Sequence, residues 1–115
     1  MKLFKEWEYK SPKIAGFLNK IQDEVHLLIP GAVIILYGSQ ARAEAKAESD
    51  WDLLILVDKK PPRELVIKVR DRLYELELES DTILSSIVRS RDEWNSDRYS
   101  ALPFKKRVER EGIIL

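Results

Sequence analysis

The chain has 115 residues, 44% of them hydrophobic, and its 20 Lys and Arg balance 20 Asp and Glu. We therefore expect one globular domain over residues 1–115, with no net field that attracts nucleic acid. The sequence contains no Cys and no apolar run as long as a signal sequence or a membrane span, which excludes disulfides and thiolate metal sites and predicts a cytoplasmic protein without membrane contact.

The N-terminal part predicts an arm followed by a helix. Residues 1–10 mix aromatic and charged side chains, which fits either a short strand or an arm packed on the domain. Ser11 and Pro12 form a helix start, and apolar residues at every third or fourth position predict an amphipathic helix to about Leu28. His26, the single histidine, lies inside this helix beside the apolar stripe. We therefore assign it no functional role.

A buried strand over residues 32–36 leads into a small-residue turn, Gly38-Ser39. Gly38 permits a sharp bend and the close approach of a ligand. We expect residues 40–47 to form a helix whose N-terminal N–H groups, with those around Ser39, meet a phosphate. The alternative is an ordinary turn without a ligand.

Two carboxylates follow at the start of a second apolar run, residues 53–57, which predicts another buried strand. Asp50 and Asp52 point the same way on an extended chain, and Trp51 points to the opposite face and into the core. Neighbouring carboxylates repel each other unless a cation neutralises them, and oxygen ligands favour Mg²⁺ or Mn²⁺. Turn and carboxylates together predict a site for a nucleoside triphosphate with its metal. The alternative is that the aspartates cap or flank a strand.

The second half predicts further helices and a third strand. Val66, Val69, Leu73 and Leu76 have helical spacing, and residues 82–88 are rich in β-branched side chains. The segment 90–93 fits a capping box that opens a short helix, and residues 103–111 predict a last helix with Gly112 as its C-cap. The apolar terminus 113–115 either folds back or contacts a partner. Alternating helices and strands indicate an α/β (α+β) domain, with a small mixed sheet covered by helices.

Four basic residues of the last helix are interrupted by two acidic ones: Lys105, Lys106, Arg107 and Arg110 by Glu109 and Glu111. No aromatic interleaving follows them, so we interpret them as a solvated helix face and do not expect direct binding of nucleic acid.

The central stretch resembles a known family motif. Gly38-Ser39, ten residues and Asp50-Trp51-Asp52 resemble the motif of DNA-polymerase-β-like nucleotidyltransferases, in particular the minimal nucleotidyltransferases (MNT), with text close to G-S-x-A-R-G, a spacer and S-D-x-D-L. The chain matches at Gly38, Ser39, Ala41, Arg42, Ser49, Asp50, Asp52 and Leu53. It departs at Ala43, where the family commonly has Gly, so residues 40–47 can form a more regular helix.

The resemblance implies roles for the matching residues. Asp50 and Asp52 would hold one or two Mg²⁺ ions, and Gly38 and Ser39 the terminal phosphates of an NTP. Arg42 would neutralise phosphate charge, although a solvated or salt-bridged Arg42 is an open alternative.

The family also carries a third carboxylate on the neighbouring strand. Asp81, at the start of the third strand, is the best candidate for this metal-binding and catalytic role, with Glu79 nearby. The alternative is that Asp81 caps the preceding helix. The strand itself offers Thr82, Ser85 and Ser86, which do not replace a carboxylate as metal ligand.

The resemblance implies transfer of a nucleotide, AMP from ATP, to an acceptor hydroxyl. Minimal nucleotidyltransferases pair with helical HEPN proteins as antitoxin to toxin, and some transfer AMP to a tyrosine of that partner. We therefore expect a Mg²⁺-dependent enzyme acting on a protein, with self-association as a further option. The alternative is a binding module with a decayed site that neutralises its partner by contact alone.

Overall fold

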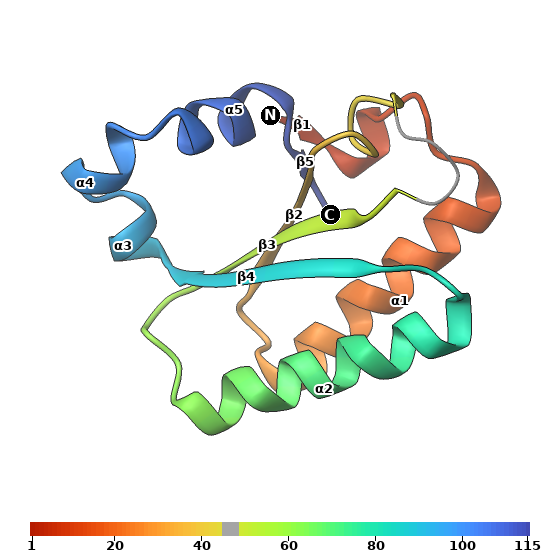
Figure 1. Cartoon of the computed structure of the whole chain (residues 1–115), viewed down its shortest axis with the longest axis horizontal. Helices are drawn as coiled ribbons and strands as arrows, with labels where there is room; N and C mark the ends of the chain where they lie inside the picture. The colour runs from red at the N-terminus through yellow and green to blue at the C-terminus, as the bar shows by residue number, and fades with distance from the viewer. Residues whose placement is uncertain (45–48) are drawn as a thin grey trace.

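The computed structural model describes residues 1–44 and 49–115. Its centre is a five-stranded mixed sheet in the order β1-β5-β2-β3-β4 (Figure 1). The strands are β1 (Lys2–Leu3), β2 (Val33–Tyr37), β3 (Trp51–Val57), β4 (Leu84–Ser90) and β5 (Ile113–Ile114). β2 runs antiparallel to β3 and β5, whereas β3 with β4 and β1 with β5 are parallel pairs. The predicted small mixed sheet is confirmed.

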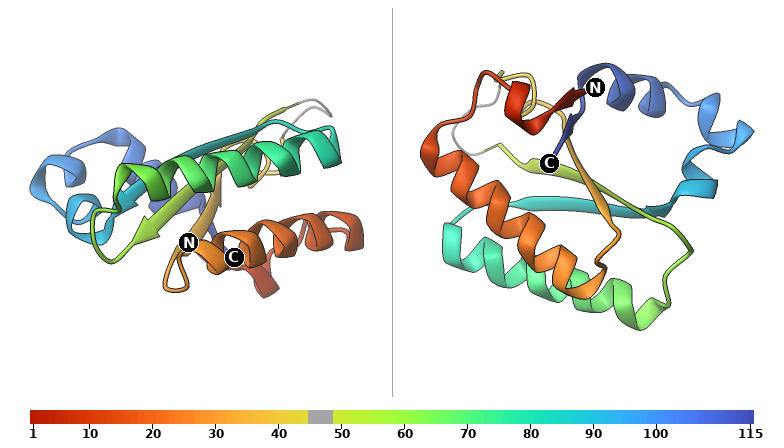
Figure 2. Two further views of the ribbon diagram at one scale, coloured as in Figure 1. Left: turned by 90° about the horizontal axis from the view of Figure 1, so that it is seen from below. Right: turned by 180° about the vertical axis from the view of Figure 1, so that it is seen from behind.

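Helices cover both faces of this sheet (Figure 2). They are α1 (Pro12–Leu28), α2 (Arg63–Ser80), α3 (Arg91–Trp94), α4 (Asp97–Ser100) and α5 (Pro103–Glu111). Because successive side chains of β3 alternate between faces, Leu53 and Ile55 pack in the core under α1 and α2, whereas Leu54 packs with Trp94 and Val108 of the short helices. Burial on both faces explains why this strand is continuously apolar.

The predicted first helix is confirmed. Ser11 Oγ accepts a hydrogen bond from the N–H of Ile14 at 3.2 Å, and Pro12 occupies the first helical position. His26 Nε2 lies 2.8 Å from the carbonyl oxygen of Ala32. This bond fastens the end of α1 to the start of β2, so His26 has a structural place away from the candidate site.

Both chain ends are part of the folded core. Trp7 is buried, and its indole Nε1 donates to the carbonyl oxygen of Ala41 at 3.1 Å. The apolar terminus folds back as β5, between β1 and β2. Gly112 ends α5 with an ordinary φ of −65°, and a Cβ there would lie 2.6 Å from the carbonyl oxygen of Val108. Glycine is required here for close packing.

The predicted helix over residues 40–47 is wrong for 40–44, which form a turn; residues 45–47 lie outside the described part of the chain. The N–H of Arg42 donates to Gly38 O at 3.2 Å, and that of Glu44 to Ser39 O at 3.0 Å. Ala43 has a φ of 57°, in the left-handed region. A right-handed helix cannot pass through this conformation, so the chain turns instead.

Three further details differ from the predictions. β4 begins at Leu84, not at residue 82, because α2 continues to Ser80 and ends in a left-handed residue, Asp81. α4 was not predicted. Lys105 does not belong to a solvated face: it is buried, and its Nζ donates to the carbonyl oxygen of Trp94 at 2.7 Å. Among the described residues, no helix has the length and apolar character needed to cross a bilayer.

Candidate active site

The antiparallel pairing of β2 and β3 places the Gly-Ser turn beside the acidic pair. Tyr37, the last residue of β2, is the register partner of Asp52 on β3, so Gly38 leaves the sheet next to the Asp52 carboxylate. Gly38 has a φ of 80°, and a Cβ on it would meet Asp52 Oδ2 at 2.3 Å. The predicted convergence of turn and carboxylate is therefore present.

The two aspartates lie on the same side of the sheet. Asp50 is exposed just before β3, and Asp52 is half-buried within it. Burial raises the pKa of Asp52 above its usual value, and the nearby charges of Asp50 and Glu111 raise it further, opposed by Arg42. Because carboxylates that repel each other in this way gain from a shared cation, this pair of oxygen ligands fits Mg²⁺ or Mn²⁺.

A glutamate from the far end of the chain contacts both the Gly-Ser turn and Arg42. Glu111, at the end of α5, accepts from the N–H of Gly38 at 3.2 Å and from Arg42 Nη1 at 3.0 and 2.9 Å. Only 9% of its side chain is exposed. Its carboxylate therefore occupies the same donors that were predicted to hold phosphate. Arg42 is salt-bridged, which is the alternative that the sequence left open for it.

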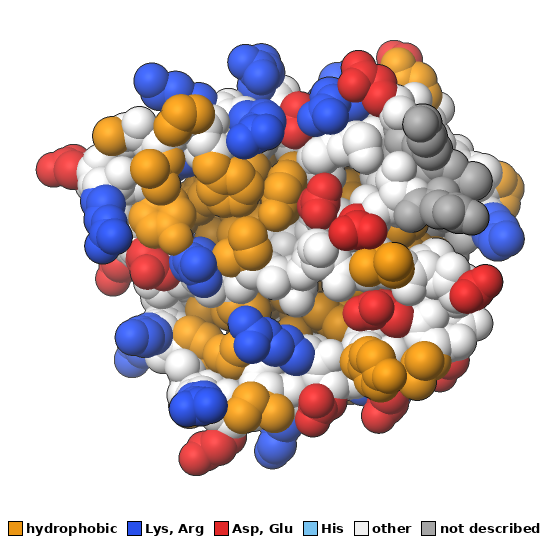
Figure 3. Space-filling view, in the orientation of Figure 1, with side chains coloured by type: hydrophobic (Ala, Val, Ile, Leu, Met, Phe, Trp, Pro, Cys, Tyr) orange, Lys and Arg blue, Asp and Glu red, His pale blue; other side chains and the backbone are white. Residues whose placement is uncertain are grey.

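The Gly-Ser turn, Arg42, Asp52 and Glu111 share one cavity of about 420 Å³. The complete lining is Tyr37, Gly38, Ser39, Arg42, Asp52, Phe104, Arg107 and Glu111. The volume lies in the range of small-molecule sites. Tyr37 and Phe104 meet edge to face at 5.4 Å between ring centroids and form an apolar wall. Figure 3 shows acidic side chains near the middle of this face of the molecule, next to a hydrophobic area over the short helices.

Glu111 and Arg107 were missed because sequence reasoning treated α5 only as a solvated helix. The bond from Arg42 to Glu111 joins residues 69 positions apart. No local spacing signals such a contact; only the fold-back of β5 against β2 brings the end of α5 to the turn.

Asp81 is the C-cap of α2, with a φ of 55°, which is the alternative left open for it. Glu79 forms an exposed ion pair with Lys20 at 2.7 Å. Within residues 1–44 and 49–115, no three side chains of the His, Cys, Asp or Glu type group closely enough to hold a metal ion. The structure therefore does not assemble Asp81 with Asp50 and Asp52.

Ser85 lies where the neighbouring strand meets the acidic pair. It is the register partner of Asp52 in the parallel pairing of β3 and β4, and its hydroxyl donates to Asp50 Oδ2 at 3.4 Å. A position on β4 that adjoins both aspartates thus carries a hydroxyl in place of a carboxylate.

Comparison with known proteins gives a family and a fold. The family model described as "Polymerase beta, Nucleotidyltransferase" matches residues 19–115. A chain of the "Crystal structure of the toxin-antitoxin with AMP-PNP" is similar with a TM-score of 0.59 and 18% sequence identity, over 84% of this chain and 69% of that chain. At this identity the likeness concerns the fold alone. No curated protein matches the sequence.

Proposed function

Because the chain belongs to the polymerase β nucleotidyltransferase family, we propose that it transfers AMP from ATP to a hydroxyl group of a protein, in a reaction that needs Mg²⁺. The observation that carries this proposal is the contact between the Gly38 turn and the carboxylate of Asp52, with Asp50 on the same side of the sheet. A phosphate-binding bend and an oxygen-ligand pair are the two parts that such a reaction needs.

In this proposal Asp50 and Asp52 bind the metal, which would supply neutralising charge to the triphosphate. The N–H groups of Gly38 and Ser39 and the guanidinium of Arg42 would hold the terminal phosphates. The acceptor oxygen forms a bond to the α-phosphorus as the bond to the bridging oxygen breaks, pyrophosphate leaves, and the hydroxyl proton passes to water. The protein's contribution is to position both reactants and to stabilise the charge.

We propose a HEPN-type toxin as the acceptor, with this chain as its antitoxin. Support comes from the fold shared with a chain of a toxin-antitoxin structure that contains AMP-PNP, an ATP analogue. The 420 Å³ cavity beside the Gly38 turn has a size that suits a small molecule such as a nucleotide. A partner that carries the hydroxyl would complete the site from outside.

A second candidate function is a binding module that neutralises its partner by contact. Two observations favour it: Ser85 stands opposite Asp52 in place of a carboxylate, and Glu111 occupies the phosphate donors. Under this alternative, the aspartates are dispensable for neutralisation.

Incubation with α-³²P-ATP and Mg²⁺, alone and with the product of the adjacent gene, separates the two. Transfer predicts a label on the partner that disappears in Asp50→Asn and Asp52→Asn. The matched control is Asp58→Asn, since Asp58 lies at the other end of β3, where it pairs with Arg91. If no label passes while the double aspartate variant still neutralises the partner, the enzyme proposal is wrong and the contact function stands.

A further inference from the structure

β4 has an open edge. It is the last strand in the sheet order, and within residues 1–44 and 49–115 it pairs with β3 alone. The N–H of Trp51 donates to the carbonyl oxygen of Ile83, so backbone groups of odd-numbered residues point to β3 and those of Leu84, Ser86 and Val88 point outward. Arg89 Nη1 covers one of these, the carbonyl oxygen of Val88, at 2.8 Å. The others are available to another strand.

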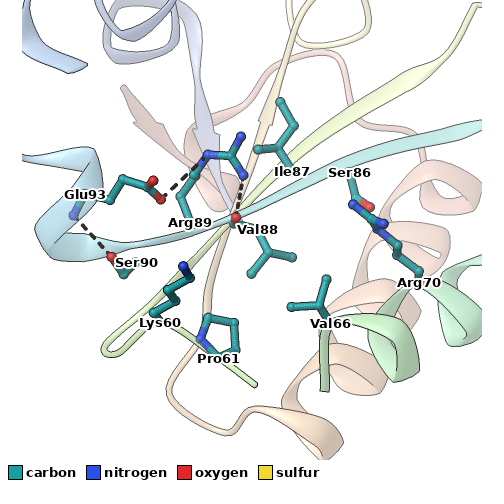
Figure 4. Close-up of a pocket in the computed structure, with 10 residues that line it drawn as sticks. All are labelled: Lys60, Pro61, Val66, Arg70, Ser86, Ile87, Val88, Arg89, Ser90 and Glu93. Atoms are coloured by element: carbon teal, nitrogen blue, oxygen red, sulfur yellow. Dashed lines mark hydrogen bonds and ion pairs between the residues drawn. The ribbon is translucent and has the colours of Figure 1, made fainter. Parts of the chain in front are cut away.

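A cavity of about 320 Å³ lies along this edge, between β4 and the first half of α2 (Figure 4). Lys60 lies at its Ser90 end and Arg70 beside Ser86, with Val66 and Val88 between them. Figure 3 shows basic and hydrophobic side chains together where β4 and α2 face each other.

The charges in this cavity are positive and in excess. Arg89 forms an ion pair with Glu93 at 3.7 Å and donates to the hydroxyl of Tyr99 at 2.6 Å. The charges of Arg89 and Glu93 therefore offset each other. Lys60 and Arg70 have no hydrogen-bond or ion-pair partner among the described residues. Two unpaired cations on either side of an apolar floor give this cavity a local positive charge, although the chain as a whole is neutral.

We infer that the free edge of β4 binds an extended acidic peptide segment of a partner protein, which adds to the sheet as a sixth strand. The outward N–H groups of Ser86 and Val88 and the carbonyl oxygen of Ser86 supply main-chain hydrogen bonds. Because alternate side chains of a strand share a face, the segment has the pattern acidic, any, apolar, any, acidic: the carboxylates meet Lys60 and Arg70, and the apolar residue contacts Val66.

The inference is independent of nucleotidyl transfer, and its test contains no nucleotide. The probe is a fluorescein-labelled peptide with the central sequence Glu-Thr-Val-Thr-Glu, titrated with the protein by fluorescence polarisation. We expect saturable binding that weakens about tenfold or more in the double variant Lys60→Glu/Arg70→Glu, since two charge pairs become repulsive. A peptide with Lys in place of Glu should bind this variant better than wild type.

The matched control is Arg63→Glu/Lys68→Glu, which makes the same change of net charge at exposed positions of α2 outside the cavity. It should leave the affinity unchanged, and circular dichroism should give native spectra for both double variants. In ¹⁵N-labelled protein, the peptide should shift the amide resonances of Ser86 and Val88.

Three results would overturn the inference. If a peptide with N-methylated backbone amides binds as tightly as the unmodified one, binding does not occur by strand addition. Equal competition by inorganic polyphosphate would assign the cations to phosphate. A dimer that forms through β4 without affinity for the peptide would assign the edge to a second copy of this chain.

Discussion

The backbone of Gly38 lies directly against the carboxylate of Asp52, with no room for a side chain between them: a Cβ on Gly38 would be 2.3 Å from Asp52 Oδ2. The contact unites two residues that are 14 positions apart in the sequence. It results from the register of β2 and β3, where Tyr37 pairs with Asp52. Any ligand held by both the turn and the carboxylate therefore depends on this single close approach.

We expect Gly38→Ala to lower both stability and metal affinity. The φ of 80° at Gly38 disfavours any L side chain, which costs about 1–2 kcal/mol, and the new methyl group must also displace Asp52. Urea unfolding and titration with Mn²⁺ measure the two effects. The control is Gly16→Ala on the exposed side of α1, where nothing lies within 4 Å of the added Cβ; it should stabilise the protein by about 1 kcal/mol. Unchanged Mn²⁺ affinity in Gly38→Ala would separate the turn from the metal.

Ala43→Gly should stabilise the protein. Ala43 has a φ of 57°, where alanine is less favourable than glycine by about 1 kcal/mol, and the greater freedom of glycine in the unfolded chain offsets part of this gain. We expect a rise of a few tenths of a kcal/mol, roughly 0.3–0.8 kcal/mol, in the free energy of unfolding. Ala47→Gly cannot act as a matched control, because residue 47 lies outside the described part of the chain. A loss of stability in Ala43→Gly would mean that the turn does not need its left-handed residue.

Local patterns predicted most of the fold, and tertiary contacts account for what they missed. The resemblance to polymerase-β-like nucleotidyltransferases is confirmed by the family match. The motif that carried the resemblance spans the turn and the carboxylates, which lie on adjacent strands. The helix predicted over residues 40–47 failed at Ala43, whose helical propensity is overridden by the tie between Trp7 and Ala41 O and the closure of the turn.

The missed part of the site has a different cause. Glu111 reaches Gly38 only because the last residues of the chain pair with β2. The apolar terminus left a fold-back open, but local spacing does not say which strand it pairs with. Which residue of the third strand lies beside the aspartates could not be predicted from the sequence either. Whether Asp81 or a residue inside the strand faces Asp52 depends on where α2 ends, and it ends at Ser80 with Asp81 as the cap.

Asp52→Asn should stabilise the metal-free protein at neutral pH while it removes metal binding. The folded-state pKa of Asp52 is raised above its ordinary 3.8, so the folded state favours the protonated acid. Stability is therefore lost as pH rises from near the ordinary pKa through the raised one. Asparagine does not ionise, and we therefore expect a higher free energy of unfolding for this variant at pH 7 in EDTA. The gain should vanish in acid. Urea unfolding at pH 3.5 and 7 measures it, and a destabilised variant at pH 7 would contradict it.

Glu111→Gln should tighten the binding of MgATP. The carboxylate of Glu111 accepts from Gly38 N–H and Arg42, so phosphate must displace it, and a neutral amide holds a guanidinium less strongly. We expect the dissociation constant, measured by isothermal titration calorimetry, to fall about 3- to 10-fold. The control is Glu109→Gln, an exposed residue of the same helix. Weaker binding in Glu111→Gln would show that the carboxylate shapes the turn instead of competing with phosphate.

Ser85→Asp should place a carboxylate on β4 beside the acidic pair, at a position where this strand carries a hydroxyl. Ser85 pairs with Asp52 in register and donates to Asp50, so an aspartate there would face the same cation. We expect Mg²⁺ affinity to rise about tenfold, since ligand charge sets the strength of such oxygen sites, and the metal-free protein to lose stability because three carboxylates repel one another. Two controls isolate the charge and the position: Ser85→Asn has the shape without the charge, and Ser86→Asp carries the charge on the opposite face of β4. If Ser85→Asp binds Mg²⁺ no better than Ser85→Asn, the neighbouring strand does not contribute to this metal site, and Asp50 and Asp52 must hold the ion by themselves.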